Sequence, residues 1–419
     1  MGEGLTKKIG YLTGEYPKAS HTFILREVSA LRDLGLTVKT ASIRRPEDKE
    51  LIGPEERRAL EDTFFVLSKS NLIPDLILGH LRLLERAPVL YFKTLALALK
   101  TARPGVRGRL WQLFYFAEAG ILAHWIRKEE IAHLHNHFAD SSSTVAMLAA
   151  KLADIPFSLT LHGPAELFEP KGWHLGEKIK HAKFTAVISN FARSQAMLFS
   201  DAEHWNKIRI VHCGVQPDRY KTKKKTAGER LRILFVGRLT AIKGVTILLD
   251  AVNILEERGV ELDLKLIGDG DERAELEDAA KGLSHVHFLG YQSQSAVAEE
   301  LQNSDLLCLP SFAEGVPVVL MEAMASGLPV IATQVGGVSE LVEDGVTGHI
   351  VPPGSASHLA DAIEDLAKSA EVRTEMGAKG QKVVSEHFDS QTEAARIAAL
   401  FLDQVEPGTI RPDPIAELG

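Results

Sequence analysis

Cysteine is scarce in this chain of 419 residues, which contains only Cys213 and Cys308. Two cysteines are too few for a disulfide framework or a cysteine-based metal site, so we expect a cytoplasmic protein of a reducing compartment. Positive charge is not in excess, because 48 Lys and Arg stand against 56 Asp and Glu, a net charge of −8. This balance argues against a chain-wide binder of nucleic acid, and no nucleic-acid partner is expected. The N-terminal residues lack the apolar segment of a signal peptide.

Long apolar runs are also absent. The nearest candidate, residues 110–126, is interrupted by Gln112, Glu118 and His124. A bilayer-spanning helix needs about 20 apolar residues, so none is predicted. What remains is an ordinary globular composition, with 45% apolar and 25% charged residues, and a length that predicts two or three domains.

Short β-branched segments alternate with segments of helical period along the whole chain, which is typical of βαβ units. In the first half we expect helices at 22–34 and throughout 72–128, and strands at 8–13, 37–43, 131–137, 158–162, 184–189 and 208–213. Six further strands are expected in the second half, at LRILFVG, LDLKLIG, HVHFLG, DLLCLP, LPVIAT and GHIVPP. The predicted fold class is therefore α/β, with two doubly wound, Rossmann-like parallel sheets.

The stretch KTKKKTAGER, residues 221–230, carries too much like charge to pack in a core and predicts a linker about which the domains move. We expect an N-terminal domain at 1–215 and a C-terminal domain at 216–388, with a terminal helix at about 389–405 packing back on the first. Ligands of open parallel sheets bind at the carboxyl ends of the strands. Two such domains therefore predict a central cleft for a ligand.

Two cations follow the first strand of the second domain. Gly237 ends LRILFVG, and Arg238 and Lys243 lead into the next helix. Arg offers a planar fork of donors and Lys a point charge, so the pair could clamp a diphosphate. The alternative is a solvated surface pair.

A second cluster lies in PSFAEGVPVVLMEAMASGLPVIAT, where seven residues separate Glu314 from Glu322. Pro317 suits the first position of a helix, whose exposed backbone N–H groups favour an anion. We expect those N–H groups to come from Gly315, Val316, Val318 and Val319. A carboxylate accepts hydrogen bonds from adjacent hydroxyls, so Glu322 could bind a ribose diol and Glu314 a sugar. The alternatives are a helix-dipole partner for Glu314 and a surface position for Glu322.

Together, FVGRLTAIKG, LIGDGDERAELE, HFLGYQ, the Glu314 to Glu322 segment and VGGVSELVEDGVTGHIVPPG resemble the nucleotide-sugar glycosyltransferases of family 4, which have the GT-B fold. The resemblance covers residues 232–354 densely. It implies that the C-terminal domain binds the donor and the N-terminal domain the acceptor. The resemblance also implies a retaining, metal-independent reaction, so neither a metal nor another cofactor is expected.

The resemblance assigns roles to the donor-side residues. Arg238 and Lys243 would stabilise the leaving nucleotide diphosphate, and Glu314 would contact the donor sugar near the reacting carbon. Glu322 would hold the ribose, while Tyr291 and the backbone before it would border the base. Gly237 and the four N–H groups of the Glu314 segment complete the predicted donor site.

In the first domain, SLTLHGPAELF places His162 at a strand end. It resembles the family's active-site histidine, which implies a hydrogen bond to the donor sugar or a role in orienting the acceptor. HLHNHFAD sets His133, His135 and His137 on one face of a strand, where they could in principle hold a metal. Similar segments in exopolysaccharide-type family members instead suggest an acceptor contact for His137.

The segment TGEYPKASHTFI resembles the first loop of the exopolysaccharide and colanic-acid branch. The paired glycines of many family members are missing, which leaves Gly14 as the donor-loop candidate.

Residues 82–128 contain nine Lys or Arg and two Glu, with aromatic and aliphatic residues between them. Such a surface could dock on anionic lipid at the inner face of the cytoplasmic membrane. The alternative is a helical subdomain that packs an apolar stripe inward, formed by Leu110, Leu113, Phe114, Ala117 and Ile121.

The sequence thus predicts transfer of a hexosyl group from a nucleotide diphosphate sugar to a saccharide acceptor. That acceptor is expected to be lipid-linked, in the biosynthesis of exopolysaccharide or of a cell-surface glycan. A nucleotide-sugar epimerase of GT-B fold, or a catalytically silent sugar-binding protein, are the competing hypotheses.

Overall fold

A computed structural model describes residues 7–18, 21–51, 53–68, 72–220 and 230–404. Within these residues the chain forms two compact units, unit 1 with residues 7–212 and 393–404, and unit 2 with residues 213–392. The sequence placed these boundaries at residues 215 and 388. Of the predicted linker, residues 221–229 lie outside the described part of the chain. The cleft between the two domains stays a prediction.

Unit 1 is built on a parallel sheet whose described strands follow the order β3-β2-β1-β4-β5-β6-β7. The strands are β1 (Lys8–Glu15), β2 (Thr37–Arg44), β3 (Thr63–Phe65), β4 (His133–His137), β5 (Phe157–Leu161), β6 (Thr185–Val187) and β7 (Ile208–Ile210). The helices are α1 (Thr22–Asp33), α2 (Pro54–Glu61), α3 (Leu72–Arg86), α4 (Pro88–Lys100), α5 (Val106–Lys128), α6 (Ser141–Ala153), α7 (Ala165–Phe168), α8 (Leu175–His181), α9 (Asn190–Leu198) and α16 (Ser390–Phe401).

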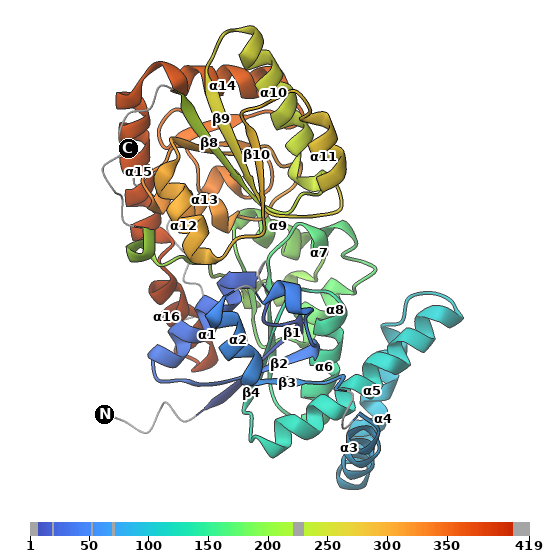
Figure 1. Cartoon of the computed structure of the whole chain (residues 1–419). Helices are drawn as coiled ribbons and strands as arrows, with labels where there is room; N and C mark the ends of the chain where they lie inside the picture. The colour runs from blue at the N-terminus through green and yellow to red at the C-terminus, as the bar shows by residue number, and fades with distance from the viewer. Residues whose placement is uncertain (1–6, 19–20, 52, 69–71, 221–229, 405–419) are drawn as a thin grey trace. The chain divides into compact units, whose positions relative to one another are not determined.

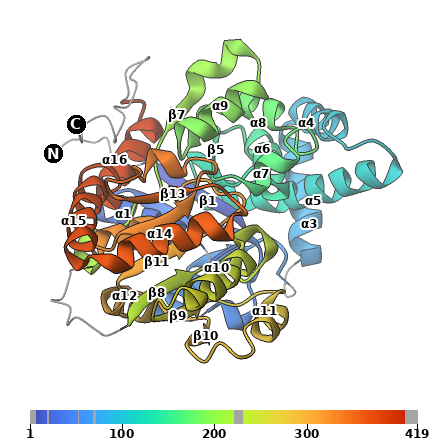
Figure 2. The same cartoon turned by 90° about the horizontal axis from the view of Figure 1, so that it is seen from above.

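Both faces of this sheet are buried, as a parallel sheet requires. Successive residues of β1 point to opposite faces: Tyr11 joins the core beneath α1 and α16, whereas Leu12 joins the core beneath α5 and α6. Helix α16 contributes Ile397 and Phe401 to the first of these cores. The C-terminal helix therefore packs on unit 1, beside α1, as Figure 1 and Figure 2 show.

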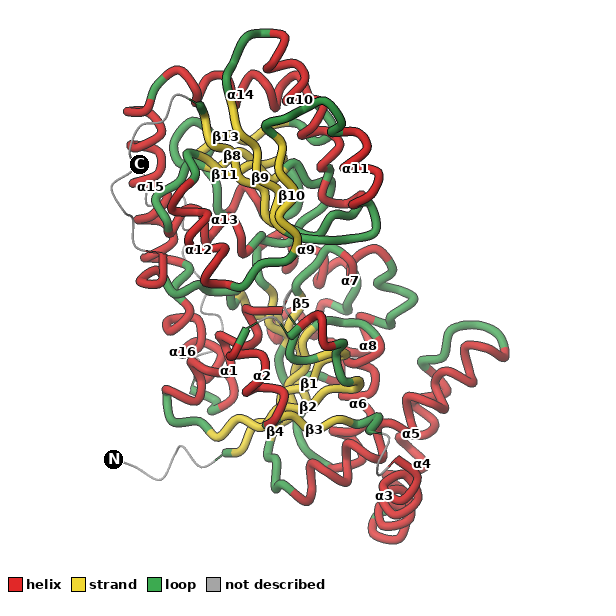
Figure 3. Tube along the Cα trace, viewed as in Figure 1, coloured by secondary structure: helices red, strands yellow, loops and turns green. Residues whose placement is uncertain are grey.

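Unit 2 contains a second parallel sheet, with the order β10-β9-β8-β11-β12-β13 in the described residues. Its strands are β8 (Leu231–Val236), β9 (Leu262–Ile267), β10 (Val286–Gly290), β11 (Leu306–Leu309), β12 (Val330–Thr333) and β13 (Gly348–Val351). Its helices are α10 (Val245–Glu257), α11 (Arg273–Ala279), α12 (Gln294–Asn303), α13 (Val318–Ala325), α14 (Ala356–Lys368) and α15 (Ala370–His387). Strands lie between helices in each unit (Figure 3), and the predicted α/β class with two parallel sheets is confirmed.

The structure corrects the sequence analysis in the first half of the chain. Helix α2 and the short strand β3 were not predicted, because they lie in or just after a charged segment with little apolar periodicity. The stripe on α5 is divided, since Ile121 is buried but Leu110, Leu113 and Phe114 are exposed. The inward packing of this stripe is therefore wrong for the first half of α5.

Helices α3, α4 and α5 lie together at one side of the unit 1 sheet (Figures 1 and 2). We call residues 72–128 the helical lobe. No helix in the described residues is both long and apolar enough to cross a membrane.

Candidate functional site

The two predicted cations of unit 2 lie in the segment that follows β8. Lys243 ends a 3-10 turn, Ala241–Lys243, and its side chain extends beside Gly237, where an added Cβ would lie 3.9 Å from Lys243 Cδ. Arg238 is exposed, and its guanidinium forms no hydrogen bond or ion pair within the described residues. The segment therefore places both cations at the carboxyl end of β8, with the Arg238 guanidinium open to a ligand.

Lys243 and Glu314 are in direct contact. Lys243 Nζ donates a hydrogen bond to Glu314 Oε1 at 2.5 Å, and Ser311 Oγ donates to the same oxygen at 2.6 Å. Glu314 is only 7% exposed, so its carboxylate is held in a protein environment where charge pairing is strong. The structure thus joins two of the predicted catalytic residues, which lie 71 positions apart in the chain.

Glycine is required at two positions that shape this contact. Gly244 has a φ of +62°, and an added Cβ would lie 2.3 Å from the Pro310 carbonyl oxygen. At Gly336, with a φ of +55°, an added Cβ would lie 1.9 Å from the carbonyl oxygen of Glu314. These close backbone approaches hold the Lys243 turn and the Glu314 loop at the same strand ends.

Helix α13 begins directly after the Glu314 loop, with Pro317 as its N-cap. The predicted N–H donors of Gly315, Val316, Val318 and Val319 make no backbone hydrogen bond within the described residues. An open N-terminus of this kind carries partial positive charge and favours an anion. The N-cap of this helix, Pro317, follows three residues after Glu314, whose carboxylate accepts the hydrogen bond from Lys243 Nζ.

Glu322 lies one turn farther along α13 and is 8% exposed. Its Oε1 accepts a hydrogen bond of 3.0 Å from the hydroxyl of Tyr220, which is itself buried. The sequence analysis did not identify Tyr220, because the two residues are 102 positions apart and no local pattern connects them. No hydrogen bond or ion pair joins Glu322 to Lys243 or Glu314 in the described residues.

Tyr291 and Gly14, the other two residues predicted to bind the donor, lie in different parts of the fold. Tyr291 follows β10 and is exposed. Gly14 lies inside β1, because the pairing of β1 with β2 continues through Glu15 and Arg44. The assignment of Gly14 to a loop after the strand is therefore wrong.

In unit 1, His162 follows β5 and stacks on His137. The two rings lie 5.1 Å apart at an interplanar angle of 22°, and His137 Nδ1 is 2.9 Å from His162 Nε2. His137 Nε2 lies 3.4 Å from Glu27 Oε1, which also accepts a 2.6 Å hydrogen bond from the Tyr11 hydroxyl. A polar chain thus runs from Tyr11 through Glu27 and His137 to His162.

The side chain of His137 is completely buried. The prediction that His137 faces the acceptor is therefore corrected: its contacts are with Glu27 and His162, and it offers no surface to a substrate. Burial lowers the pKa of His162 well below its ordinary value, and nearby His137 adds to this effect. His162 is therefore neutral near pH 7, with one ring nitrogen to donate and one to accept.

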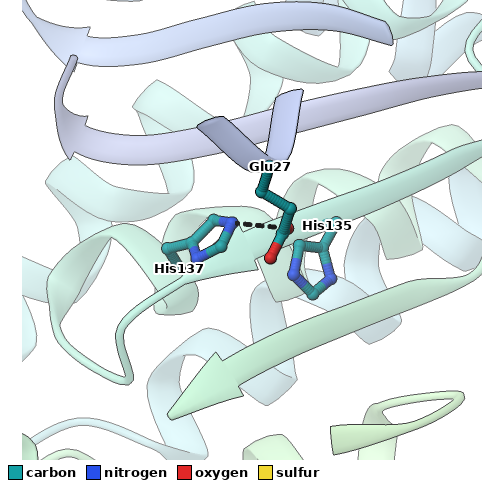
Figure 4. Close-up of side chains that lie close together, drawn as sticks. All are labelled: Glu27, His135 and His137. Atoms are coloured by element: carbon teal, nitrogen blue, oxygen red, sulfur yellow. Dashed lines mark ion pairs between the residues drawn. The ribbon is translucent and has the colours of Figure 1, made fainter. Parts of the chain in front are cut away.

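Glu27, His135 and His137 place three potential ligand atoms within 4.8 Å of one another (Figure 4). However, His135 Nδ1 is 2.8 Å from Ser158 Oγ, and His135 Nε2 is 2.9 Å from Thr160 Oγ1. Both ring nitrogens of His135 are thus engaged with hydroxyl groups. This donor set fits a hydrogen-bonded histidine network better than a metal site.

Glu166 was missed by the sequence analysis, although it lies only four residues after His162. Its carboxylate accepts hydrogen bonds from the backbone N–H groups of Ala139, His162 and Gly163 at 2.7 to 2.8 Å. Burial raises the pKa of Glu166 to about 7. Glu166 ties the loop after β4 to the loop after β5 and so fixes the backbone of His162.

Lys178 supports the same loops from α8. Its buried ammonium donates to the carbonyl oxygens of Ala139 and Asp140, and burial lowers its pKa to about 7. The strand ends of unit 1 thus carry a rigid polar framework. Chemically, unit 2 offers cations and amides for an anion, and unit 1 offers a neutral imidazole for a hydroxyl.

Comparison with known sequences finds two families. Residues 217–383 match the family described as "Glycosyl transferases group 1", and residues 80–219 match "Glycosyltransferase Family 4". The chain is 32% identical over 288 residues to the phosphatidyl-myo-inositol mannosyltransferase of Mycobacterium leprae, covering 65% of this chain and 73% of that protein. It is 28% identical over 390 residues to the amylovoran biosynthesis glycosyltransferase AmsK of Erwinia amylovora, covering 86% and 91%.

Among solved structures, the chain is similar to HepE of Anabaena, which was crystallised in complex with UDP and glucose. The TM-score is 0.71 at 19% identity, over 95% of this chain and all of HepE. At this identity the likeness concerns the fold.

Proposed function

The chain belongs to the family 4 glycosyltransferases and has the GT-B fold, and we propose that it transfers a hexosyl group from a nucleotide diphosphate sugar. The transfer retains the anomeric configuration, and the acceptor is a hydroxyl of a saccharide that is lipid-linked. The product belongs to an exopolysaccharide or a cell-surface glycan. The mannosyl transfer to a lipid named for the M. leprae relative, and the amylovoran biosynthesis named for AmsK, support this proposal.

The observation that carries the proposal is the contact between Lys243 and Glu314 beside the open N-terminus of α13. A diphosphate needs positive charge and N–H donors, and a hexose needs a carboxylate as acceptor for its hydroxyls. Both requirements meet where the Lys243 turn contacts the Glu314 loop. In the donor complex, Lys243 and Arg238 bind the diphosphate, and Glu314 binds the sugar.

The reaction breaks the bond between the anomeric carbon and the phosphate oxygen, so negative charge grows on the leaving diphosphate. Lys243, Arg238 and the amides at the start of α13 stabilise this charge before the reaction begins. Two cations supply the neutralisation that a divalent ion provides in other enzymes, so the transfer does not require a metal. Glu322, fixed by Tyr220, binds the ribose, and Tyr291 borders the base.

His162 contributes from unit 1. Its neutral imidazole hydrogen-bonds a sugar hydroxyl of the donor or orients the acceptor, and Glu166 and His137 hold it in place.

The proposed location is the inner face of the cytoplasmic membrane, reached through the helical lobe. Eleven of the eighteen exposed large hydrophobic side chains in the described residues belong to this lobe: Ile77, Leu78, Leu81, Val89, Phe92, Leu99, Val106, Leu110, Trp111, Leu113 and Phe114. Basic residues are interleaved with them, and anionic lipid attracts such a surface. Docking there would bring the enzyme to a lipid-linked acceptor.

The direct test is a thermal-shift screen of the full chain against UDP, GDP, ADP and their sugars, followed by transfer assays with the stabilising sugar nucleotide. A ligand that binds the native state raises its apparent stability, so one nucleotide series should raise Tm. NMR of the product should show retained anomeric configuration, and chelator should not reduce the rate. Conversion of the donor without an acceptor would indicate an epimerase, and binding without turnover across a broad acceptor panel would indicate a silent sugar-binding protein.

A further inference from the structure

A separate cavity in unit 1 has the lining of a carbohydrate site. It has a volume of about 390 Å³, within the range of small-molecule sites. Its wall includes the first half of α5, Thr144 of α6 and residues 172–174 between α7 and α8.

Three aromatic rings line this cavity. Trp111 and Tyr115 lie on successive turns of α5 with their rings 6.1 Å apart, and Trp173 lines the cavity from the segment after α7. Aromatic faces suit the apolar C–H face of a pyranose ring.

The charge of the cavity is positive. Arg103 is fixed by a 2.6 Å ion pair with Glu169 and lies 4.6 Å above the ring of Trp173, so its charge is balanced. Arg107, in the first turn of α5, is exposed and forms no ion pair within the described residues. No Asp or Glu lines the cavity. One guanidinium is therefore left for an anionic group, which its planar fork binds as carboxylate or phosphate.

A buried hydrogen-bond acceptor also lines the cavity. Gln112 lines the cavity and is 6% exposed; its Nε2 donates to the Thr101 carbonyl oxygen at 2.6 Å, but its Oε1 is buried with no hydrogen-bond partner. A buried acceptor without a donor is unfavourable, and a sugar hydroxyl would supply one.

We propose that this cavity binds an anionic sugar unit of the acceptor, a pyranose that carries a carboxylate or a phosphate. The ring packs against Trp111 and Trp173, the anionic group pairs with Arg107, and a hydroxyl donates to Gln112 Oε1. The claim that the bound sugar is part of the acceptor rests on the proposed function. The claim that the cavity binds an anionic sugar rests on the lining of the cavity alone.

The experiment is saturation-transfer NMR titration of the full chain with methyl glucuronide, glucose 1-phosphate, neutral methyl glucoside and inorganic phosphate. Methyl glucuronide or glucose 1-phosphate should bind, and Arg107→Gln should weaken that binding about 10-fold, as expected for a lost charged hydrogen bond. Trp173→Ala should abolish it. Arg109→Gln, which removes a neighbouring exposed charge of α5 outside the cavity, should have no effect, and the two anionic probes distinguish carboxylate from phosphate.

Equal effects of Arg107→Gln and Arg109→Gln would overturn the proposal, as would equal binding of the neutral glucoside or of phosphate alone. The Tm increase with nucleotide is measured on the same variants. Sugar binding without a nucleotide response would defeat the proposed function but not this site, and the reverse result would defeat the site alone.

Discussion

At the scale of single residues, Glu166 shows how one carboxylate organises a functional strand end. Its two oxygens accept three backbone N–H groups, two of them from His162 and Gly163. An amide cannot replace it, because a Gln would present an NH₂ group to one set of these donors. The backbone position of His162 therefore depends on the Glu166 carboxylate.

We expect Glu166→Gln to lower the free energy of unfolding by about 1–3 kcal/mol, the usual cost of leaving buried donors unsatisfied. Transfer activity should fall with it, because the His162 backbone shifts. Chemical denaturation and kcat measurements check both effects, with Glu169→Gln, an exposed carboxylate three residues later, as the control for folding. Unchanged stability in Glu166→Gln would contradict the contacts assigned to it.

Glu118 on α5 makes stability depend on pH. Burial raises the pKa of Glu118 to about 7, although Arg44 partly opposes this. The native state then holds this proton up to about pH 7, whereas the unfolded chain releases it near 4.5. Stability is therefore lost as pH rises through this range, because the native state binds more protons than the unfolded chain.

Glu118→Gln should remove this loss. Between about pH 5 and about pH 8 the wild-type chain should lose up to about 3 kcal/mol more unfolding free energy than the variant. Urea denaturation at both pH values measures the difference, with Glu85→Gln on exposed α3 as the matched charge control. If the unfolding free energy of the wild type and of Glu118→Gln changed with pH in the same way, burial would not raise the pKa of Glu118.

At the scale of elements, the helices of the helical lobe could be predicted from the sequence, but the side of each helix that is buried could not. The helical period of residues 72–128 was enough to predict the helices, and alternation of β-branched segments was enough for all six strands of unit 2. Which side of α5 is covered depends on α3, α4 and α6, whose buried residues form one core with those of α5 from Phe116 to Ile126. Periodicity predicts a stripe but not the element that covers it.

Contacts between distant segments were equally invisible in the sequence. Lys243 and Glu314 could be predicted individually from residue type and motif, but their contact and the support of Glu322 by Tyr220 required the fold. Glu166 is local to His162, so its position four residues later could have been noticed as a cap for the turn. His137 was misplaced because strand alternation predicts a shared face and not its depth.

The lobe should bind anionic vesicles through its apolar side chains. Replacing Val89, Phe92 and Phe114 by Ser removes three side chains that are 59% to 67% exposed, so folding should be unaffected. Binding to vesicles containing phosphatidylglycerol should fall at least about 10-fold, because each side chain no longer buries its apolar area in the interface. Cosedimentation with these vesicles at low and high salt measures the binding of the wild-type chain and of the triple variant.

Leu198→Ser provides the control for the lobe. This α9 residue is 69% exposed and lies outside residues 72–128. It should bind vesicles as the wild-type chain does. If the triple variant also binds as wild type, the lobe is not the docking surface.

At the scale of the whole molecule, the two units carry different kinds of polar group around their parallel sheets. Unit 2 carries cations and open amides at its strand ends and two buried carboxylates, whereas unit 1 carries a buried histidine network and a cavity lined by aromatic rings. The proposed function accounts for this difference, since it assigns the nucleotide sugar to unit 2 and the acceptor to unit 1. Unit 2 is therefore expected to bind a diphosphate through these cations and N–H groups.

Calorimetric titration with the nucleoside diphosphate that stabilises the wild-type chain tests this claim most directly. Lys243→Ala should weaken binding about 10- to 100-fold through loss of a charged hydrogen bond, and Lys243→Arg should recover part of it. Lys265→Ala, which removes an ion-paired lysine of β9 outside the site, should bind as wild type. Unchanged affinity in Lys243→Ala would contradict the account.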